Sequence, residues 1–388
     1  MRVLLAFDKF KDAITAHTAC TIAADTLREL HPDWEIDTAP LTDGGEGFAE
    51  ILTHSARGQL HSCTVKGPRG DSLDAYFGLV PLAHIPAPAR TQLALLDHTP
   101  SHASIAIVEM ASASGLALLQ PSQRDPWQTT SFGTGQLMLA AAQRNAAAIL
   151  LGVGGSATND LGLGALAALG LSFEASSDTR LSPPSPAKWN NLTRIIGRVD
   201  PAFPPIRIAC DVTNPLLGAN GCTAVFGPQK GLKPADVSRL EAASAHAAHL
   251  LLQHHAQPVT LLHTPGAGAA GGIAFGLMCA AHAKLLPGFS LVSAWLDLDA
   301  RIAAADLVLT GEGRFDATSL GGKGPGAVIA RARAFGKPAH VFAGAIPAEL
   351  SRTDSTLHAI TPPNFPLPEA LRSTSALLAN AIRTTRLL

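Results

Sequence analysis

The stretch "VLLAFDKFKDAIT", residues 3–15, carries the pattern that decides the fold. Its first five residues are apolar and the run ends at Asp8, which is typical of a buried strand in a parallel sheet. A helical spacing of apolar residues follows over residues 17–30, and "WEIDTAPL", residues 34–41, predicts a second strand. The segment "FAEILTHSA", residues 48–56, predicts a second helix. This β-α-β-α beginning predicts a doubly wound α/β sheet.

The rhythm of the sequence changes near residue 62 and returns near residue 285. The segment "SCTVKGPRGDSLDAYFGLV", residues 62–80, alternates around a PRGD turn and predicts antiparallel strands. The chain of 388 residues is long enough for more than one hydrophobic core. We therefore expect one α/β domain built from residues 1–63 and 285–388, with a mixed domain of residues 64–284 inserted into it.

The composition excludes several kinds of partner. A formal net charge of −1 gives no electrostatic field that favours nucleic acid or an anionic membrane. Five dispersed cysteines without a CxxC pair indicate reduced thiols in a cytoplasmic protein rather than disulfides or a zinc site. The apolar stretch at residues 266–281 is short and glycine-rich, so we expect no membrane span. The sequence does not decide between a monomer and a homo-oligomer.

Polar loops follow the predicted strands at five places. In open α/β sheets, ligands bind in the crevice outside the carboxyl ends of the strands. Because only 15% of the residues are charged, five such loops indicate a shared cleft. The loops are "DKFKD" (8–12), "TDGGEG" (42–47), "GVGGSATND" (152–160), "CDVTNP" (210–215) and "TGEGRFD" (310–316).

Two glycine-rich turns follow apolar runs, "GVGGSATND" and "PGAGAAGG", the latter at residues 265–272. A turn that leads into a helix presents backbone N–H groups and the positive end of the helix dipole to an anion. Glycine serves equally where chains pack closely or where φ is positive, so either turn alone leaves both interpretations open. Two hydroxyl donors favour anion binding in the first turn, although its aspartate also suits a helix cap. The candidate ligands are Gly154, Gly155, Ser156, Thr158, Asn159 and Asp160, with Gly266 and Gly268 in the second turn.

The second turn has the GxGxxG spacing of a dinucleotide site, but its surroundings differ from one. A dinucleotide fold places this motif in its first βαβ unit, with an acidic residue at the end of the next strand. Here the motif comes late in the chain, and the next acidic residue, Asp297, lies beyond a Pro-Gly break. We therefore do not expect a nicotinamide-dependent dehydrogenase.

The carboxylates and cations of these loops suit phosphoryl transfer. Asp43 and Glu46 lie on a flexible turn and offer oxygens that suit Mg²⁺, which takes one or two carboxylates together with substrate phosphates. Asp211 follows directly on a buried strand. Such chemistry needs positioned oxygens and neutralised phosphate charge rather than covalent help. Further candidates of both charges are Lys11, Lys230, Glu312, Arg314 and Asp316.

The loops together resemble the type 1 glycerate kinase family. The family's opening loop commonly reads D-S-F-K-G-S; Asp8, Phe10 and Lys11 keep that form here, whereas residues 9, 12 and 13 are Lys, Asp and Ala. The departure leaves room for a related hydroxy acid as substrate. The matching segments occur in the family's order over nearly the whole chain. They are "FDKFKDAITA", "LTDGGEGF", "GVGGSATNDLGLGALAALG", "CDVTNPLLGANGCTAVFGPQKG", "PGAGAAGG" and "LTGEGRFDATSLGGKGP".

The resemblance implies an ATP-dependent kinase that phosphorylates D-glycerate at its 2-hydroxyl, giving 2-phosphoglycerate and ADP. It implies a Rossmann-like parallel-sheet domain with a second mixed α/β domain inserted, and a cleft between them. The glycine turns would then frame a phosphate or the substrate anion rather than a nicotinamide dinucleotide. The remaining alternatives are a kinase of another small hydroxy acid and a non-catalytic nucleotide- or metabolite-binding protein.

Within that cleft we expect each charged group to have a separate task. The loop at 154–159 and Arg314 are candidates for the glycerate carboxylate. Asp211 would orient the attacking hydroxyl and accept its proton, with Asp43 as the rival for that role. Otherwise Asp43 and Glu46 would hold Mg²⁺, and Lys11 would neutralise the transferring phosphate.

Overall fold

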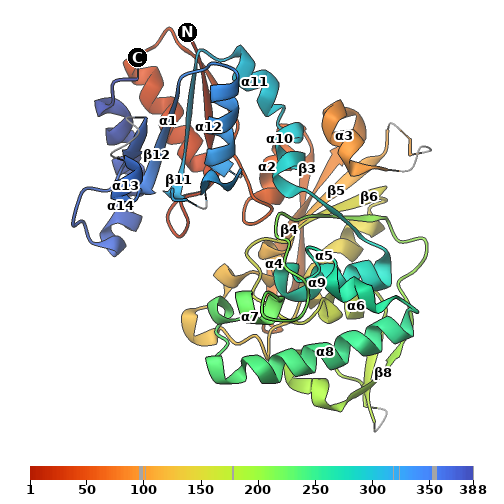
Figure 1. The fold of residues 1–388 in the computed structure, drawn as a ribbon. Helices are drawn as coiled ribbons and strands as arrows, with labels where there is room; N and C mark the ends of the chain where they lie inside the picture. Colours follow the sequence, from red (N-terminus) through yellow and green to blue (C-terminus); the bar gives the residue numbers. More distant parts are fainter. Residues whose placement is uncertain are drawn as a thin grey trace. The chain divides into compact units, whose positions relative to one another are not determined.

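The computed structural model describes residues 1–95, 99–100, 102–176, 179–317, 319–322, 324–351 and 356–387. The chain forms two compact units, drawn in Figure 1. The first unit joins Met1–Asp43 to Val292–Leu388, and the second is the continuous segment Gly44–Leu291. The domain boundaries that we expect from the sequence, at residues 63/64 and 284/285, stay a prediction.

The first unit is built on a five-stranded sheet with the order β13-β12-β11-β1-β2. Every neighbouring pair in it is parallel, for example Val3 opposite Leu307. The apolar run that begins at Val3 is fully buried as β1, which confirms the predicted strand. The strands are β1 (Arg2–Phe7), β2 (Glu35–Thr38), β11 (Leu307–Arg314), β12 (Ala339–Ala345) and β13 (Leu357–Ala359).

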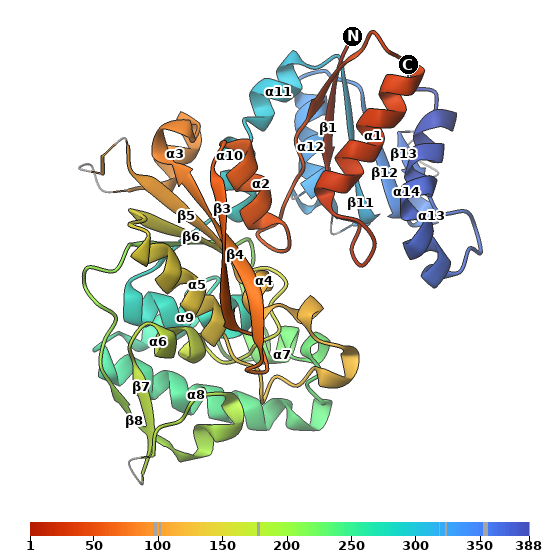
Figure 2. The same cartoon turned by 180° about the vertical axis from the view of Figure 1, so that it is seen from behind.

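Helices cover both faces of this sheet (Figures 1 and 2). Helices α1 (Ala16–Leu30) and α14 (Leu367–Thr384) share one core with the side chains of one face of the sheet. Helix α12 (Gly324–Ala334) packs on the other face, where Ile329 contacts a second small core. The unit also contains α11 (Leu298–Ala304) and α13 (Ala348–Ser351).

The connections of the sheet reverse between β1 and β11. The chain runs from β1 outward to β2 on one side, and from β11 outward to β12 and β13 on the other. The crossover helices α1 and α12 therefore lie on opposite faces, as right-handed connections require. This reversal is a topological switch point, the place where open α/β sheets bind ligands.

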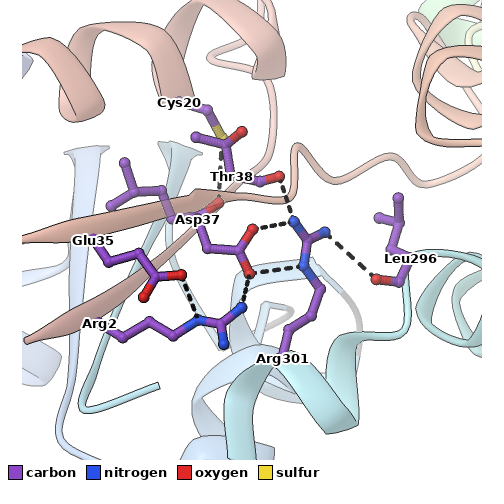
Figure 3. A network of polar contacts seen from close by, with 8 residues as sticks. Arg2, Cys20, Glu35, Asp37, Thr38, Leu296 and Arg301 are labelled. Atoms are coloured by element: carbon purple, nitrogen blue, oxygen red, sulfur yellow. Dashed lines mark hydrogen bonds and ion pairs between the residues drawn. The ribbon is translucent and has the colours of Figure 1, made fainter. Parts of the chain in front are cut away.

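A network of ion pairs ties the edge strand β2 to the rest of the first unit (Figure 3). Asp37 on β2 accepts hydrogen bonds from Arg301 of α11, one of them at 3.0 Å from Nε to Oδ2. The guanidinium of Arg2 lies 3.6 Å from the same carboxylate. Burial alone would raise the pKa of Asp37, but the hydrogen bonds and charges of the two arginines hold it below its ordinary value. The ionised carboxylate is therefore the form that the folded state prefers.

The second unit contains a six-stranded mixed sheet with the order β10-β9-β6-β5-β4-β3. Strands β3, β4 and β5 pair antiparallel, which confirms the alternating pattern at residues 62–80, and the remaining pairs are parallel. The strands are β3 (Gln59–Lys66), β4 (Ser72–Pro81), β5 (Ser104–Glu109), β6 (Ala148–Gly152), β9 (Ile206–Ala209) and β10 (Lys284–Leu286), with a separate pair β7 (Ser172–Ala175) and β8 (Leu192–Ile196). The predicted fold class, a parallel α/β unit with a mixed α/β unit inserted, is thus confirmed.

One face of the sheet in the second unit packs on a large hydrophobic core that it shares with several helices. The apolar helix α9 (Ala269–Ala281) lies inside that core and is only 13 residues long. Among the described residues, no helix is both long and apolar enough to cross a membrane. The other helices are α2 (Phe48–Ser55), α3 (Ala87–Leu93), α4 (Ala111–Ser114), α5 (Phe132–Gln143), α6 (Leu163–Ala168), α7 (Cys222–Phe226) and α8 (Val237–His254), and α10 (Gly288–Trp295) follows β10.

Candidate active site

Parts of two predicted loops lie together in the second unit, beside the carboxyl ends of β6 and β9. The N–H of Gly154 donates to the carbonyl of Gly44 at 2.9 Å. A Cβ atom on Gly44 would lie 3.4 Å from the carbonyl oxygen of Ala209, the last residue of β9. A Cβ atom on Gly155 would lie 3.7 Å from the carboxylate of Glu46. The GGEG turn therefore packs directly against the GVGGSATND loop.

A buried lysine holds the GVGGSATND loop in shape. The ammonium of Lys230 donates to the hydroxyl of Ser156 at 2.8 Å and to the carbonyl of Thr158 at 2.6 Å. Lys230 is only 2% exposed, and this burial lowers its pKa to about 8 despite the opposing effect of Cys222 and Asp160. At neutral pH the loop is thus organised around a positive charge.

The same loop buries polar atoms that the protein satisfies only in part. The side-chain amide of Asn159 donates to the hydroxyl of Thr223 at 3.2 Å. Its carbonyl oxygen and the hydroxyl of Thr158 are buried and have no hydrogen-bond partner among the described residues. Unsatisfied buried polar atoms are rare and often mark sites where water or a ligand completes the network.

Asp160 is placed as a structural anchor rather than as a ligand. Its carboxylate accepts hydrogen bonds from the N–H and hydroxyl of Ser131 at 2.7 and 2.8 Å, and from the N–H groups of Gly162 and Gly164 at 3.2 Å each. It is fully buried. These hydrogen bonds agree with the helix-capping interpretation of Asp160, and its expected role in substrate binding stays a prediction.

The PGAGAAGG turn supports the GVGGSATND loop by close packing. A Cβ atom on Gly271 would lie 2.0 Å from the carbonyl oxygen of Thr158, and the N–H of Leu161 donates to the carbonyl of Gly271 at 3.0 Å. Gly268 donates its N–H to Asn214 at 3.0 Å. Gly266 and Gly268 are both buried. The arrangement favours a packing role for these glycines over the expected anion-binding role, because only glycine allows backbones to approach this closely.

Asp211 stands at the carboxyl end of β9, as the sequence predicts. It is half-buried, and its Oδ2 accepts the N–H of Phe289 at 2.9 Å. A Cβ atom on Gly288 would lie 3.0 Å from the same oxygen. The carboxylate is thus held by backbone at the start of α10.

The first unit gathers a second set of charges at the carboxyl ends of β1 and β11. The ammonium of Lys9 forms an ion pair with Asp43 at 2.9 Å. The pKa of the neighbouring Asp8 is raised to about 7, chiefly by burial, with the charges of Asp43 and Glu312 adding to the rise and the charge of Lys9 opposing it. Burial also raises the pKa of Glu312. Burial thus favours the protonated form of two carboxyl groups in this cluster, those of Asp8 and Glu312.

The loop TDGGEG is divided between the two units. Asp43 belongs to the first and Glu46 to the second, so their joint role as Mg²⁺ ligands stays a prediction. Across the parts of the chain that the structure describes, no group of three or more His, Cys, Asp or Glu side chains is arranged to hold a metal ion. A divalent cation would therefore need oxygens from a substrate as well.

A cavity of about 790 Å³ opens beside the charged cluster of the first unit. Lys11 and Arg314 both line it. Arg314 is 73% exposed and forms an ion pair with Asp316 at 3.2 Å. The cavity lies at the switch point of the sheet, where the loops after β1 and β11 diverge.

The candidate ligands from sequence did not include Asp8 and Lys9. Asp8 could have been found from its position, because it ends a buried strand just as Asp211 does. Lys9 carries no local signal of its own, since a lysine on a loop is usually solvated. Its pairing with Asp43 depends on two loops 34 residues apart in the chain.

Several known proteins are similar to this chain over most of its length. A model of the glycerate kinase family matches residues 3–387. A glycerate kinase of Haemophilus influenzae is 37% identical over 89% of this chain and 86% of its own length. A glycerate 2-kinase of Escherichia coli K12 is 36% identical over the same shares of the two chains. The crystal structure of a Salmonella typhimurium LT2 protein with the provisional name glycerate kinase 2 is 34% identical and has a TM-score of 0.75, covering 99% of this chain and 96% of that one. The chain therefore belongs to the glycerate kinase family.

Proposed function

We propose that this chain is an ATP-dependent kinase that phosphorylates D-glycerate at the 2-hydroxyl and releases 2-phosphoglycerate and ADP. The observation that carries the proposal is its relation, over nearly the whole chain, to relatives named as glycerate kinases and as a glycerate 2-kinase. The charged groups at the strand ends of both units support it. Phosphoryl transfer depends mainly on positioned charges, and this chain offers them on both sheets.

The acceptor is proposed to bind at the GVGGSATND loop. Gly155 is exposed at the tip of this loop, while Lys230 places a buried positive charge directly behind it. A charge in a desolvated position acts on a nearby anion more strongly than one in water. Arg314 of the first unit stays our second candidate for the glycerate carboxylate.

Asp211 is proposed to orient the attacking hydroxyl. The 2-hydroxyl oxygen of glycerate forms a bond to the γ-phosphorus, the bond from that phosphorus to the bridging oxygen of ADP breaks, and the hydroxyl proton passes to the carboxylate of Asp211. The backbone contact at Phe289 restricts the position of the carboxylate, which suits this task. Asp43, paired with Lys9 and half exposed, suits metal binding better.

Magnesium is proposed to enter with the nucleotide. Carboxylates are hard oxygen donors that suit this ion, and the expected ligands are Asp43 of the first unit and Glu46 of the second. Because no group of three such side chains among the described residues is arranged to hold a metal, the remaining oxygens would come from the nucleotide phosphates. When bound, the ion would neutralise part of the negative charge of the nucleotide phosphates. Lys11 is proposed to neutralise the rest.

The setting in which the enzyme works is proposed from the sequence. The structure describes all five cysteines and joins none of them in a disulfide, which agrees with a reducing compartment. We therefore keep the expectation of a cytoplasmic enzyme. Both a monomer and a homo-oligomer are compatible with this proposal.

The direct test of the proposed function is to identify the product. The protein is incubated with Mg-ATP and a panel of small hydroxy acids and polyols, and phosphorus NMR locates the new phosphate. We expect D-glycerate to be the preferred acceptor and the phosphate to be on its 2-hydroxyl. Preference for a different acid would instead support the alternative kinase, which the residues at positions 9, 12 and 13 leave room for. If none of the acids leads to release of ADP, the proposal is wrong.

Replacing Asp211 with Asn tests the proposed base. The variant keeps the size of the side chain and an oxygen for the N–H of Phe289 but loses the proton acceptor. We expect kcat to fall on the order of 10²- to 10⁴-fold with a smaller change in KM, measured by coupled release of ADP. Asp200→Asn, at an exposed turn before β9, is the matched control and should keep wild-type turnover. Wild-type kcat in Asp211→Asn would remove this residue from the chemistry.

The proposed role of Lys230 predicts that binding of the acceptor depends on pH. Its ammonium is charged below a pKa of about 8 and becomes neutral as the pH rises through that value. The KM for glycerate should therefore rise above about pH 8. At pH 7, Lys230→Met should raise that KM about 10- to 100-fold, the value of one hydrogen bond to a charged group, and should abolish the dependence above pH 8.

The control for this variant is Lys233→Met, which removes an exposed lysine three residues away. It should bind glycerate as the wild type does. Thermal unfolding of both variants shows whether the buried substitution still folds. A folded Lys230→Met variant with an unchanged KM at pH 7 would exclude a role for this charge in acceptor binding.

A further inference from the structure

The cavity of the first unit has two chemically different walls. The loop that follows β1 and the carboxyl end of β11 form one wall and carry Lys9, Lys11 and Arg314 beside carboxylates. The segment after β12 and β13 and the start of α14 form the other wall, which is apolar. Its lining side chains include Ile346, Ala359, Pro362, Phe365, Leu367 and Leu371.

The apolar wall is exposed more than the fold requires. Leu367, at the start of α14, is 69% exposed, and Phe365 is only half-buried. Glycerate is a small polar anion and gains nothing from such a wall. A ligand that gains from it has an apolar ring at one end and a charged chain at the other.

We propose that this cavity binds the nucleotide of the kinase reaction, with adenosine on the apolar wall and the phosphate chain toward Lys9, Lys11 and Arg314. This inference rests on the proposed kinase function and gives its nucleotide a place within the first unit alone. The cavity volume of about 790 Å³ lies in the range of sites for ligands of this size. Its position at the switch point is the position at which open α/β sheets bind nucleotides.

The charges of the polar wall favour a metal–nucleotide complex over a free polyphosphate. Four carboxyl groups line the cavity, those of Asp8, Asp12, Asp43 and Glu312, against three cationic side chains. A bare triphosphate would be repelled by the carboxylates. A divalent cation that accompanies it would be attracted by the same groups. We therefore expect nucleotide binding to require Mg²⁺.

A tryptophan placed in the apolar wall tests the inference by direct binding. Ala359 lines the cavity and is exposed, so Ala359→Trp fills the cavity without entering the core. Binding of Mg-ATP to the full chain, without glycerate, is measured by calorimetry. We expect the dissociation constant of Ala359→Trp to rise more than tenfold. Ala303→Trp, at an exposed position of α11 outside the cavity, is the matched control and should bind as the wild type does.

The orientation of the nucleotide is tested with its two halves. Ala359→Trp should weaken binding of adenosine, whereas Arg314→Gln should weaken binding of magnesium tripolyphosphate and leave adenosine unchanged. The proposed orientation is wrong if Ala359→Trp weakens binding of magnesium tripolyphosphate and Arg314→Gln weakens binding of adenosine.

The possible failures of the inference and of the kinase proposal can be told apart. If the wild type binds Mg-ATP and phosphorylates glycerate, but Ala359→Trp binds Mg-ATP normally, the nucleotide site lies elsewhere and the kinase proposal stands. If Ala359→Trp weakens binding of Mg-ATP but the wild type phosphorylates no acid, the nucleotide site stands and the kinase proposal fails. If the wild type binds no Mg-ATP, both fail.

Discussion

Strands β1 and β11 run side by side and parallel, yet the chain leaves them in opposite directions. The N–H of Asp8 donates to the carbonyl of Gly311 at 2.9 Å, and residues that follow both positions in the chain line the cavity. Because the connections leave the two strands toward opposite faces of the sheet, a hollow forms at their carboxyl ends. The charged groups of the first unit stand around that hollow because the topology brings them there. Their chemistry depends first on this arrangement of strands.

In the second unit, close backbone packing holds the GVGGSATND loop in shape. Three successive residues at 270–272 adopt left-handed conformations and press against the back of the loop at 158–161. The ammonium of Lys230 also holds this loop, by hydrogen bonds to Ser156 and Thr158. A loop held in this way keeps its shape before any substrate arrives, and a preorganised site need not reorganise during the reaction.

The sequence predicts the fold class well because the fold depends on local patterns. The apolar run from Val3 and the alternation at residues 62–80 each indicate a strand type without reference to the rest of the chain. The strand-end position of Asp211 follows from the same reasoning. The family resemblance adds information that no single loop provides, because it rests on the order of several loops along the chain.

The details that the sequence did not predict depend on tertiary contacts. A glycine turn that binds an anion and one that packs closely have the same local pattern, and the nearness of Thr158 to Gly271 decides between them only in the fold. Asp160 looks like a ligand until Ser131 is seen to donate to it from 29 residues away. Lys230 appears as a loop lysine in the sequence, and its burial depends on Ser156, 74 residues earlier. The acidic loop at 42–47 divides between the two units at a residue that no local signal marks.

The central claim is that each unit serves one substrate, the first the nucleotide and the second the acid. Hydrogen–deuterium exchange of the full chain, read peptide by peptide with one ligand at a time, tests it most directly. A non-hydrolysable ATP analogue with Mg²⁺ should slow exchange at residues 8–13 and 359–371, and D-glycerate should slow it at residues 152–160. Protection of residues 152–160 by the nucleotide, with residues 8–13 and 359–371 unchanged, would contradict the account.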